Sequence, residues 1–179
     1  VGIQDESIAV QKSVRNITDG SNSPGDVLEY TLEFQVSDFF GFEDVVLTDV
    51  ISDGQRFDTG FAPTLDFSAN PASNDFSGNF VLNTNYTVDS TDIGNTGPGW
   101  PASDGTDGTQ TITFNVSGLL AEQLLGGCVD PTQANNPPDC GSYDNGATTG
   151  TIAFRTIIQD EFSDDYPSGD ESVDHGDTL

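Results

Sequence analysis

Apolar and polar positions alternate most clearly over residues 27–38, VLEYTLEFQVSD. A two-residue period is that of a β-strand that buries one face and turns the other to solvent. The polar face carries Glu29, Thr31, Glu33 and Gln35. The apolar face, which we predict to lie in the core, carries Leu28, Tyr30, Leu32, Phe34 and Val36.

The same period recurs elsewhere and predicts strands over residues 7–15, 45–54, 109–120 and 146–162. In the stretch 45–54, one register places Val45, Leu47, Asp49 and Ile51 on a common face. In the stretch 109–120, the inward residues are Ile112, Phe114 and Val116.

From about residue 55 to 110 the alternation weakens, and Asn, Ser, Gly and Pro become frequent. A short strand is predicted at 80–88. We interpret 55–110 as an insertion with its own small hairpins. The best candidate for a helical turn is 119–127, LLAEQLLGG, which Gly126 and Gly127 would end.

Short strands separated by turn clusters, with almost no helix, are typical of an all-β Greek-key β-sandwich. The 179 residues fit one such module. It would span residues 1–179, with the insertion at about 55–110, a cysteine-flanked loop at 128–140 and an acidic tail at 160–179.

The first predicted strand places Ile8, Val10, Lys12 and Val14 on one face, and Lys12 is the only lysine of the chain. Either its amine is shut away from solvent between two sheets and faces Asp49, or it lies near the rim, reaches water along its alkyl stem and pairs with an acid. An Asp near a strand end also often caps the following turn, which is the alternative role of Asp49.

The net charge of the chain limits the kinds of partner that it could bind. The chain has 30 acidic and four basic residues, a net charge of −26 at pH 7. Such a charge repels polyanions, which argues against nucleic acid and anionic lipid. A halophilic or marine source, or titration by divalent cations, would account for it. No apolar run in the sequence is long enough to predict membrane insertion.

Cys128 and Cys140 flank a loop rich in Pro, Asn and Asp. A metal site would need more ligands nearby, so a local disulfide is the simpler interpretation, and it implies an oxidising, extracellular location. Three N-glycosylation triplets, at Asn16, Asn85 and Asn115, agree with export, although such triplets also arise by chance.

The segment from Asp160 to Asp177 is crowded with carboxylates, and hard oxygen ligands in a loop suit Ca²⁺. A solvated acidic face is the alternative for each of these residues. Asp104 and Asp107 form a second, weaker cluster. The candidate Ca²⁺ ligands are Asp160, Glu161, Asp164, Asp165, Asp170, Glu171 and Asp174.

Signals for catalysis are poor, and we predict no enzymatic activity. The one histidine, His175, has no second His with which to build a zinc site. Nothing singles out a carboxylate pair for glycoside hydrolysis. Trp100 in GPGWP either stacks on a sugar or packs over the sandwich.

Three stretches, SIAVQKSV, SPGDVLEYTLEFQV and VVLTDVISDG, resemble in order and spacing the surface-repeat modules of bacteria and archaea. These modules are immunoglobulin-like sandwiches, similar to the fimbrial domains that form internal isopeptide bonds. The resemblance covers residues 7–54 well, 111–118 and 150–179 loosely, and about 55–110 not at all.

In the isopeptide-forming members, a Lys of the first strand bonds to an Asn or Asp of the last strand, beside a buried acid that shuttles protons. The resemblance implies that Lys12 is that lysine and Asp49 that acid. The last strand would begin where this sequence ends, at Leu179, so its partner residue is unassigned. We expect that strand to be missing here or to be donated by a neighbouring copy.

These observations favour a non-enzymatic structural module of an extracellular adhesin, S-layer or filament protein, joined to neighbouring copies or tandem modules. The alternative is a module that binds a glycan or a surface protein through the loops within 55–110 and 128–140. A carboxylate-based hydrolase is the least favoured hypothesis.

Overall fold

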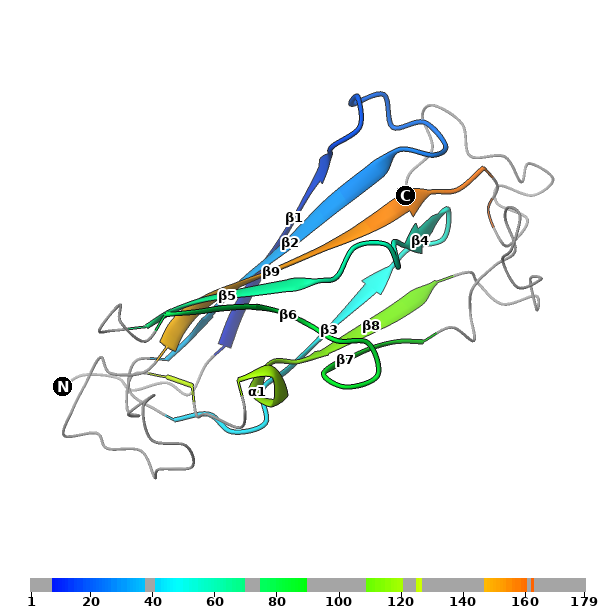
Figure 1. The fold of residues 1–179 in the computed structure, drawn as a ribbon. Coiled ribbons are helices and arrows are strands. Elements are labelled where there is room, and N and C mark those ends of the chain that lie inside the picture. The colour runs from blue at the N-terminus through cyan, green and yellow to red at the C-terminus, as the bar shows by residue number, and fades with distance from the viewer. Residues whose placement is uncertain are drawn as a thin grey trace.

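The computed structural model describes residues 8–37, 41–69, 75–89, 109–120, 125–126, 147–160 and 162. Two antiparallel β-sheets of unequal size face each other in this part of the chain (Figure 1). No helix among the described residues is long and apolar enough to cross a membrane.

The larger sheet has the strand order β1-β2-β9-β5-β6. The short β4 (Gln55–Phe57) also pairs with it, at the end of β9. Its other strands are β1 (Ile8–Asn16), β2 (Val27–Val36), β9 (Ala147–Ile158), β5 (Thr64–Ala69) and β6 (Phe76–Asn79).

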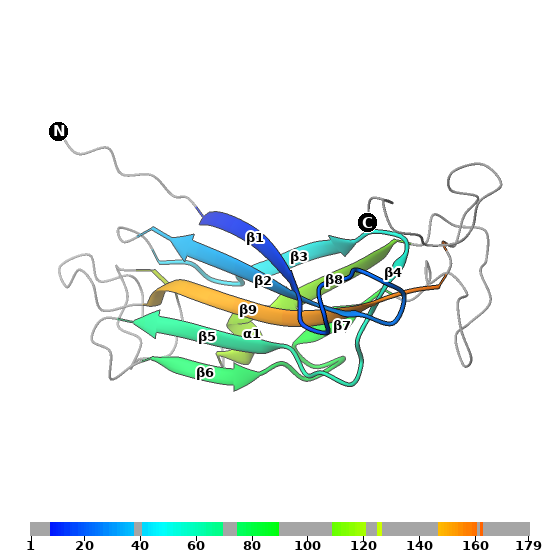
Figure 2. The ribbon, with the colours of Figure 1, turned by 90° about the horizontal axis from the view of Figure 1, so that it is seen from above.

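The smaller sheet has the order β3-β8-β7. These strands are β3 (Val46–Ile51), β8 (Gln110–Asn115) and β7 (Tyr86–Val88). The chain leaves β8 through one helical turn, α1 (Val116–Leu119), whose N-terminus is capped by the Asn115 side chain. Seen from above, β1 and β3 lie toward the same side of the molecule (Figure 2).

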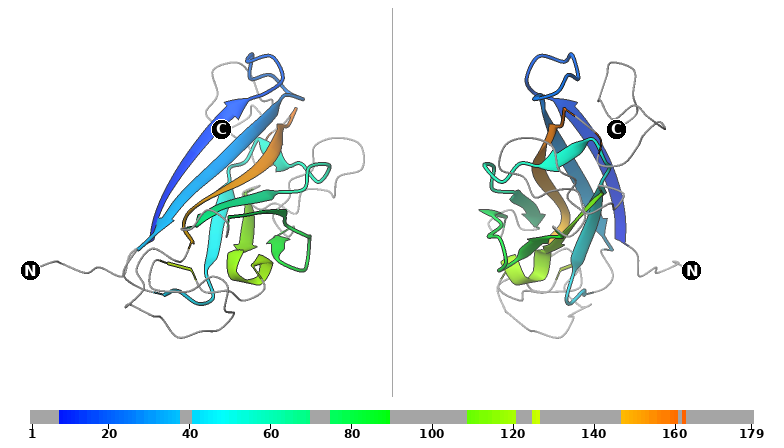
Figure 3. Two further views of the ribbon diagram at one scale, coloured as in Figure 1. Left: turned by 60° about the vertical axis from the view of Figure 1, so that its left-hand side comes forward. Right: turned by 90° about the vertical axis from the view of Figure 1, so that its right-hand side faces the viewer.

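Aromatic rings join the two sheets. The rings of Phe114 on β8 and Phe154 on β9 lie 5.7 Å apart between their centroids, and Tyr30 stacks on Phe154 at 5.1 Å. All three side chains are buried. The core therefore lies between β2 and β9 on one side and β8 on the other. Figure 3 shows the ribbon of the two sheets from two further directions.

The predicted inward faces are confirmed. The five predicted inward residues of β2 are all buried, as are Ile112, Phe114 and Val116. On β3 the alternation also holds, because Val45, Leu47 and Ile51 are buried. The prediction of an all-β fold with almost no helix is likewise confirmed.

The middle of the chain, interpreted as an insertion with its own small hairpins at about 55–110, contributes in its described part to the sandwich itself. Within it, β5 pairs directly with β9 and belongs to the larger sheet, and Leu65 and Phe67 are buried core residues. Pairing with β9 therefore brings β5 into the larger sheet, although Asn, Ser, Gly and Pro are frequent in the surrounding sequence.

Two local predictions fare differently. A helical turn lies at Val116–Leu119, where Asn115 accepts a hydrogen bond from the N–H of Gly118, whereas most of the turn predicted at 119–127 lies outside the described residues. Of the strand predicted at 80–88, only Tyr86–Val88 is extended, since residues 83–85 form a turn.

Candidate functional site

Lys12 lies where the first strand meets the smaller sheet. On β1 it is opposite Leu32 of β2, so its side chain points to the inner face. Its Nζ lies 2.9 Å from Oδ2 of Asp49 and donates a hydrogen bond to Oδ1 at 3.0 Å. A longer contact of 3.4 Å reaches the carbonyl of Val50, and the ammonium sits 4.6 Å from the ring centre of Tyr30.

The structure therefore brings Lys12 and Asp49 together, but it does not bury the amine. The Lys12 side chain is 38% exposed, whereas that of Asp49 is 13% exposed. The interpretation in which the amine is shut away from solvent is wrong. Because β3 is the last described strand on this side of the smaller sheet, the geometry matches the alternative of a lysine at the rim paired with an acid.

The two oxygens of Asp49 differ. Oδ1 accepts the hydrogen bond from Lys12. Oδ2 is buried and has no hydrogen-bond partner among the described residues, so its 2.9 Å contact with Nζ is an ion pair without hydrogen-bond geometry. A buried acceptor without a donor is uncommon and costs free energy. The Lys12 ammonium at 2.9 Å balances the charge of this oxygen, which therefore has an ionic partner but no geometric hydrogen bond among the described residues.

The Tyr30 phenol connects this ion pair to the core. Burial raises the pKa of the Tyr30 hydroxyl, the nearby negative charge of Asp49 raises this pKa further, and a hydrogen bond with Gln55 opposes the rise. The hydroxyl donates to Oε1 of Gln55 at 2.8 Å. Tyr30 is thus held neutral, with its ring against the ammonium of Lys12.

Gln55 organises a buried polar cluster that the sequence patterns did not reveal. Its Oε1 also accepts from the Thr156 hydroxyl at 2.8 Å, and its Nε2 donates to Oγ of Ser52 at 3.1 Å. Another buried amide, that of Gln110, accepts from the backbone N–H of Phe57 at 2.7 Å. The only signal in the sequence is that both glutamines begin strands whose alternate residues are apolar.

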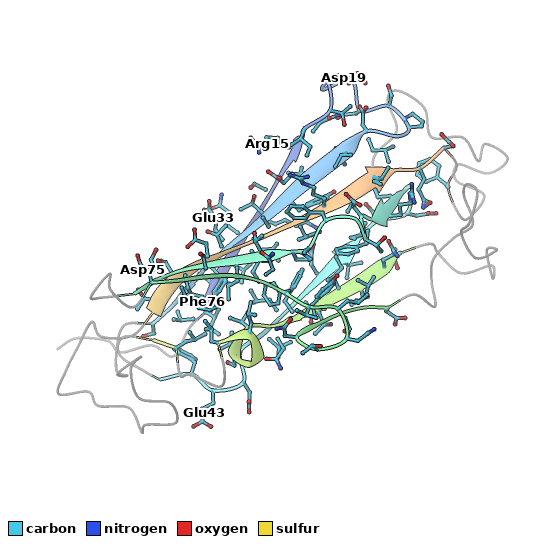
Figure 4. All side chains as sticks on the ribbon, viewed as in Figure 1. Arg15, Asp19, Glu33, Glu43, Asp75 and Phe76 are labelled. Atoms are coloured by element: carbon cyan, nitrogen blue, oxygen red, sulfur yellow. The ribbon has the colours of Figure 1, made fainter. Side chains whose placement is uncertain are left out.

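A second set of charges links three strands on the outer face of the larger sheet. Glu29 on β2 contacts Arg15 on β1 at 2.6 Å and Arg155 on β9 at 2.9 Å. The hydrogen bond from Arg15, aided by the charge and hydrogen bond of Arg155, holds the pKa of Glu29 below its usual value. Figure 4 shows Arg15 and Glu33 on the side of the sheet that faces away from the smaller sheet.

Several predicted site residues lie outside the described part of the chain. They include Cys128, Cys140, Trp100 and His175, and of the predicted Ca²⁺ ligands only Asp160 is described, as an exposed residue. Within the described ranges, no three His, Cys, Asp or Glu side chains are grouped to hold a metal. The disulfide and the calcium site stay predictions.

The three asparagines of the glycosylation triplets are described, and each takes part in local hydrogen bonds. Asn16 donates to Asp26 at 2.8 Å, and Asn115 caps α1. Asn85 accepts from the backbone of Val81 within the turn before β7. These contacts give the asparagines structural roles, and glycosylation of them stays a prediction.

No protein-family model, curated protein or solved structure matches the chain. The function must therefore be argued from the arrangement of charges and strands.

Proposed function

We propose that this chain is a non-enzymatic structural module of a secreted or surface-anchored protein, such as an adhesin, an S-layer protein or a filament, and that its sandwich has immunoglobulin-like Greek-key topology. The observation that carries the proposal is the tie between Lys12 and Asp49. It joins the first strand to the opposite sheet, across the open side of the sandwich.

The positions of the few basic residues support this structural role. Three of the four basic residues form ion pairs between different strands: Lys12 with β3, and Arg15 and Arg155 with β2. Each pair resists sliding of one strand past another, since sliding separates the charges. Such cross-strand ties suit a domain that holds its neighbours under tension.

The covalent staple expected from the resemblance would use the same lysine. An uncharged Nζ would attack a side-chain carbonyl carbon, forming an amide bond and releasing water from an acid or ammonia from an amide. In the resemblance Asp49, which contacts Lys12, is the acid that shuttles protons, and the attacked carbonyl belongs to an unassigned residue of the last strand. Intact mass spectrometry tests the staple: a mass lower than that of the sequence by one water or one ammonia is expected, and the full mass would leave the ion pair as the only tie.

The mechanical role is tested by pulling single molecules from their two ends. We expect Lys12→Met to lower the unfolding force, because it removes the ammonium and keeps most of the stem. Ser77→Ala, on the exposed β6 edge, is the matched control. Equal forces for Lys12→Met and the unchanged protein would contradict the proposal.

The calcium and export components need separate measurements. Added EDTA should lower the melting temperature if the acidic tail binds Ca²⁺. Titration of native thiols should find none free if Cys128 and Cys140 are bonded. Two free thiols would remove the main argument for an extracellular location.

Glycan binding is a second candidate function, favoured by a trough of about 540 Å³ that crosses four strands of the larger sheet. Amides, hydroxyls and carboxylates of this kind bind sugar hydroxyls in proteins. Its polar lining is Gln11, Glu33, Gln35, Asp66, Ser68, Thr149 and Thr151. A glycan array is the test, with Glu33→Gln expected to abolish any binding that uses this trough.

A further inference from the structure

The inner face of β1 is apolar but uncovered. Val10 lies opposite Phe34, and Val14 lies opposite Tyr30, so each valine shares a face with a buried aromatic residue of β2. The valines themselves are 51% and 55% exposed. The cause is the smaller sheet, which has no described strand beyond β3 to cover β1.

The edge of β3 next to this face pairs with no described strand, and among its outward backbone groups the Val50 carbonyl has a contact from the Lys12 side chain. The carbonyl of Val45 accepts from the N–H of Val116, so the odd-numbered residues of β3 pair with β8. The N–H and C=O groups of Val46, Thr48 and Val50 therefore point to the other edge, where no described strand lies. Lys12 contacts the Val50 carbonyl, which shows that this edge faces β1.

Between these two features lies the Lys12–Asp49 ion pair. Oδ2 of Asp49 is buried at the same edge, and its contact among the described residues is the Lys12 ammonium at 2.9 Å, without a geometric hydrogen bond. An exposed apolar face, an open strand edge and a buried carboxylate oxygen that can accept a further hydrogen bond thus occur together. Each of these three features limits the kind of segment that could bind between β1 and β3.

We infer that this side of the sandwich is an acceptor site for one extended strand of a partner polypeptide, which pairs with the open edge of β3 and lies beneath β1. The inference identifies the partner site of the proposed structural role and so rests on it. Pairing of this kind takes its affinity from backbone hydrogen bonds and its specificity from alternate side chains.

The site defines the chemistry of that strand. Apolar residues at alternate positions would cover Val10 and Val14. Between them, a hydroxyl or a side-chain amide would donate to Oδ2 of Asp49. Acidic residues are disfavoured by the net charge of −26. The same charge disfavours a second copy of this chain as the occupant.

The test uses a synthetic peptide of about ten residues, matched to a typical strand. Its inward positions are Val, Val, Asn, Val and Val, its other positions are Thr, and a Lys at each end keeps it soluble. Amide hydrogen exchange is followed by NMR. We expect the peptide to slow exchange at Val46, Thr48 and Val50 by at least tenfold, with no such change along β6.

Two sets of variants localise the binding. Thr48→Pro removes an N–H from the open edge without removing a bond to β8, and it should abolish binding. Ser77→Pro is the matched control: the Phe80 N–H pairs with the Pro63 carbonyl, so the Ser77 N–H points to the free edge of β6, and binding should persist. Val10→Thr with Val14→Thr should weaken binding several-fold, even if Thr48→Pro proves unfolded.

Other outcomes overturn the inference. Val46, Thr48 and Val50 amides that are already protected without peptide would mean that the chain fills the site itself. Protection that grows with protein concentration alone would assign the site to a second copy, and protection along β6 or nowhere would leave no strand site at β3. If the peptide binds but Lys12→Met leaves the unfolding force unchanged, the strand-binding site is supported and the mechanical role of the protein is rejected.

Discussion

The ring of Phe34 occupies the space that a side chain would need at Gly150. A Cβ on Gly150 would lie 2.5 Å from Cζ of Phe34 and 3.1 Å from Cε2 of Phe67. These two rings meet edge to face at 5.1 Å, and both are buried. Glycine at this position therefore lets β2 and β5 bring their aromatic residues together above β9.

Gly150→Ala should accordingly destabilise the protein by about 1–3 kcal/mol, the usual cost of overpacking a core. Urea unfolding followed by fluorescence or circular dichroism measures this loss. In the background of Phe34→Leu, which removes the nearest ring atoms, Gly150→Ala should cost less. Equal losses in both backgrounds would show that Phe34 is not the obstacle.

Replacing Gln55 should be costly, because one oxygen serves two buried donors. Gln55→Leu keeps the volume but leaves the hydroxyls of Tyr30 and Thr156 without their acceptor. We expect a loss of about 2–4 kcal/mol in urea unfolding, since each unpaired buried group costs about 1–3 kcal/mol. Adding Tyr30→Phe to Gln55→Leu should cost less than Tyr30→Phe alone, and strict additivity would contradict the cluster.

The Lys12–Asp49 pair should show measurable coupling. In a double-mutant cycle with Lys12→Met and Asp49→Asn, we expect about 1 kcal/mol of interaction free energy, at the upper end for exposed pairs because Asp49 is mostly covered. The comparison pair is Arg15–Glu29, whose arginine is 72% exposed and should couple more weakly. Both values should fall in 1 M salt. Equal coupling in the two pairs would contradict this ranking.

Asp26 should make stability depend on acid pH. Hydrogen bonds from the Asn16 amide, the Ser23 backbone and the Ser21 hydroxyl hold the pKa of Asp26 below its ordinary value of 3.8. A carboxyl with a lowered pKa stabilises the fold fully above its unfolded pKa, and the contribution is lost as pH falls through the folded pKa.

The measurement compares urea unfolding of the unchanged protein and Asp26→Asn between pH 7 and pH 2. The gap in stability between them should be largest at neutral pH, should begin to narrow below about pH 4 and should close as pH falls through the lowered pKa of the folded state. Asp66→Asn, on the exposed face of β5, is the control. A gap for Asp26→Asn that stays constant down to pH 2 would rule out this role for the carboxylate.

Alternation predicted β1, β2, β3, β8 and β9 well. Each of these strands either has one face covered by the opposite sheet or pairs with a strand that has one. Alternation was not used to assign β5, although the six residues of that strand, TLDFSA, alternate and are as many as those of β3 or β8. The stretches around it are rich in Asn, Ser, Gly and Pro, and its place in the sheet comes from pairing with β9, which lies far along the chain. A period in the sequence reports which side of a strand is buried, and it contains no information on which strand lies beside it.

The same limit applies to the site. The alternation placed Lys12 and Asp49 on inward faces, and the structure brings them into contact. The exposure of Lys12 depends on how far the smaller sheet extends beneath β1, which is a property of the whole sandwich. The Gln55 cluster was missed for a related reason: a polar residue at the start of a strand resembles a turn residue until its buried partners are known.

The central position of β9 has a consequence for biosynthesis. Arg155 on β9 contacts Glu29 on β2 across 126 positions of the chain. At the usual ribosomal rates of about 5–20 residues per second, the β1–β2 hairpin waits on the order of ten seconds for the strand that completes its sheet. We expect newly made chains to mature slowly, with mutual repulsion between acidic polypeptides keeping them from aggregating in the meantime.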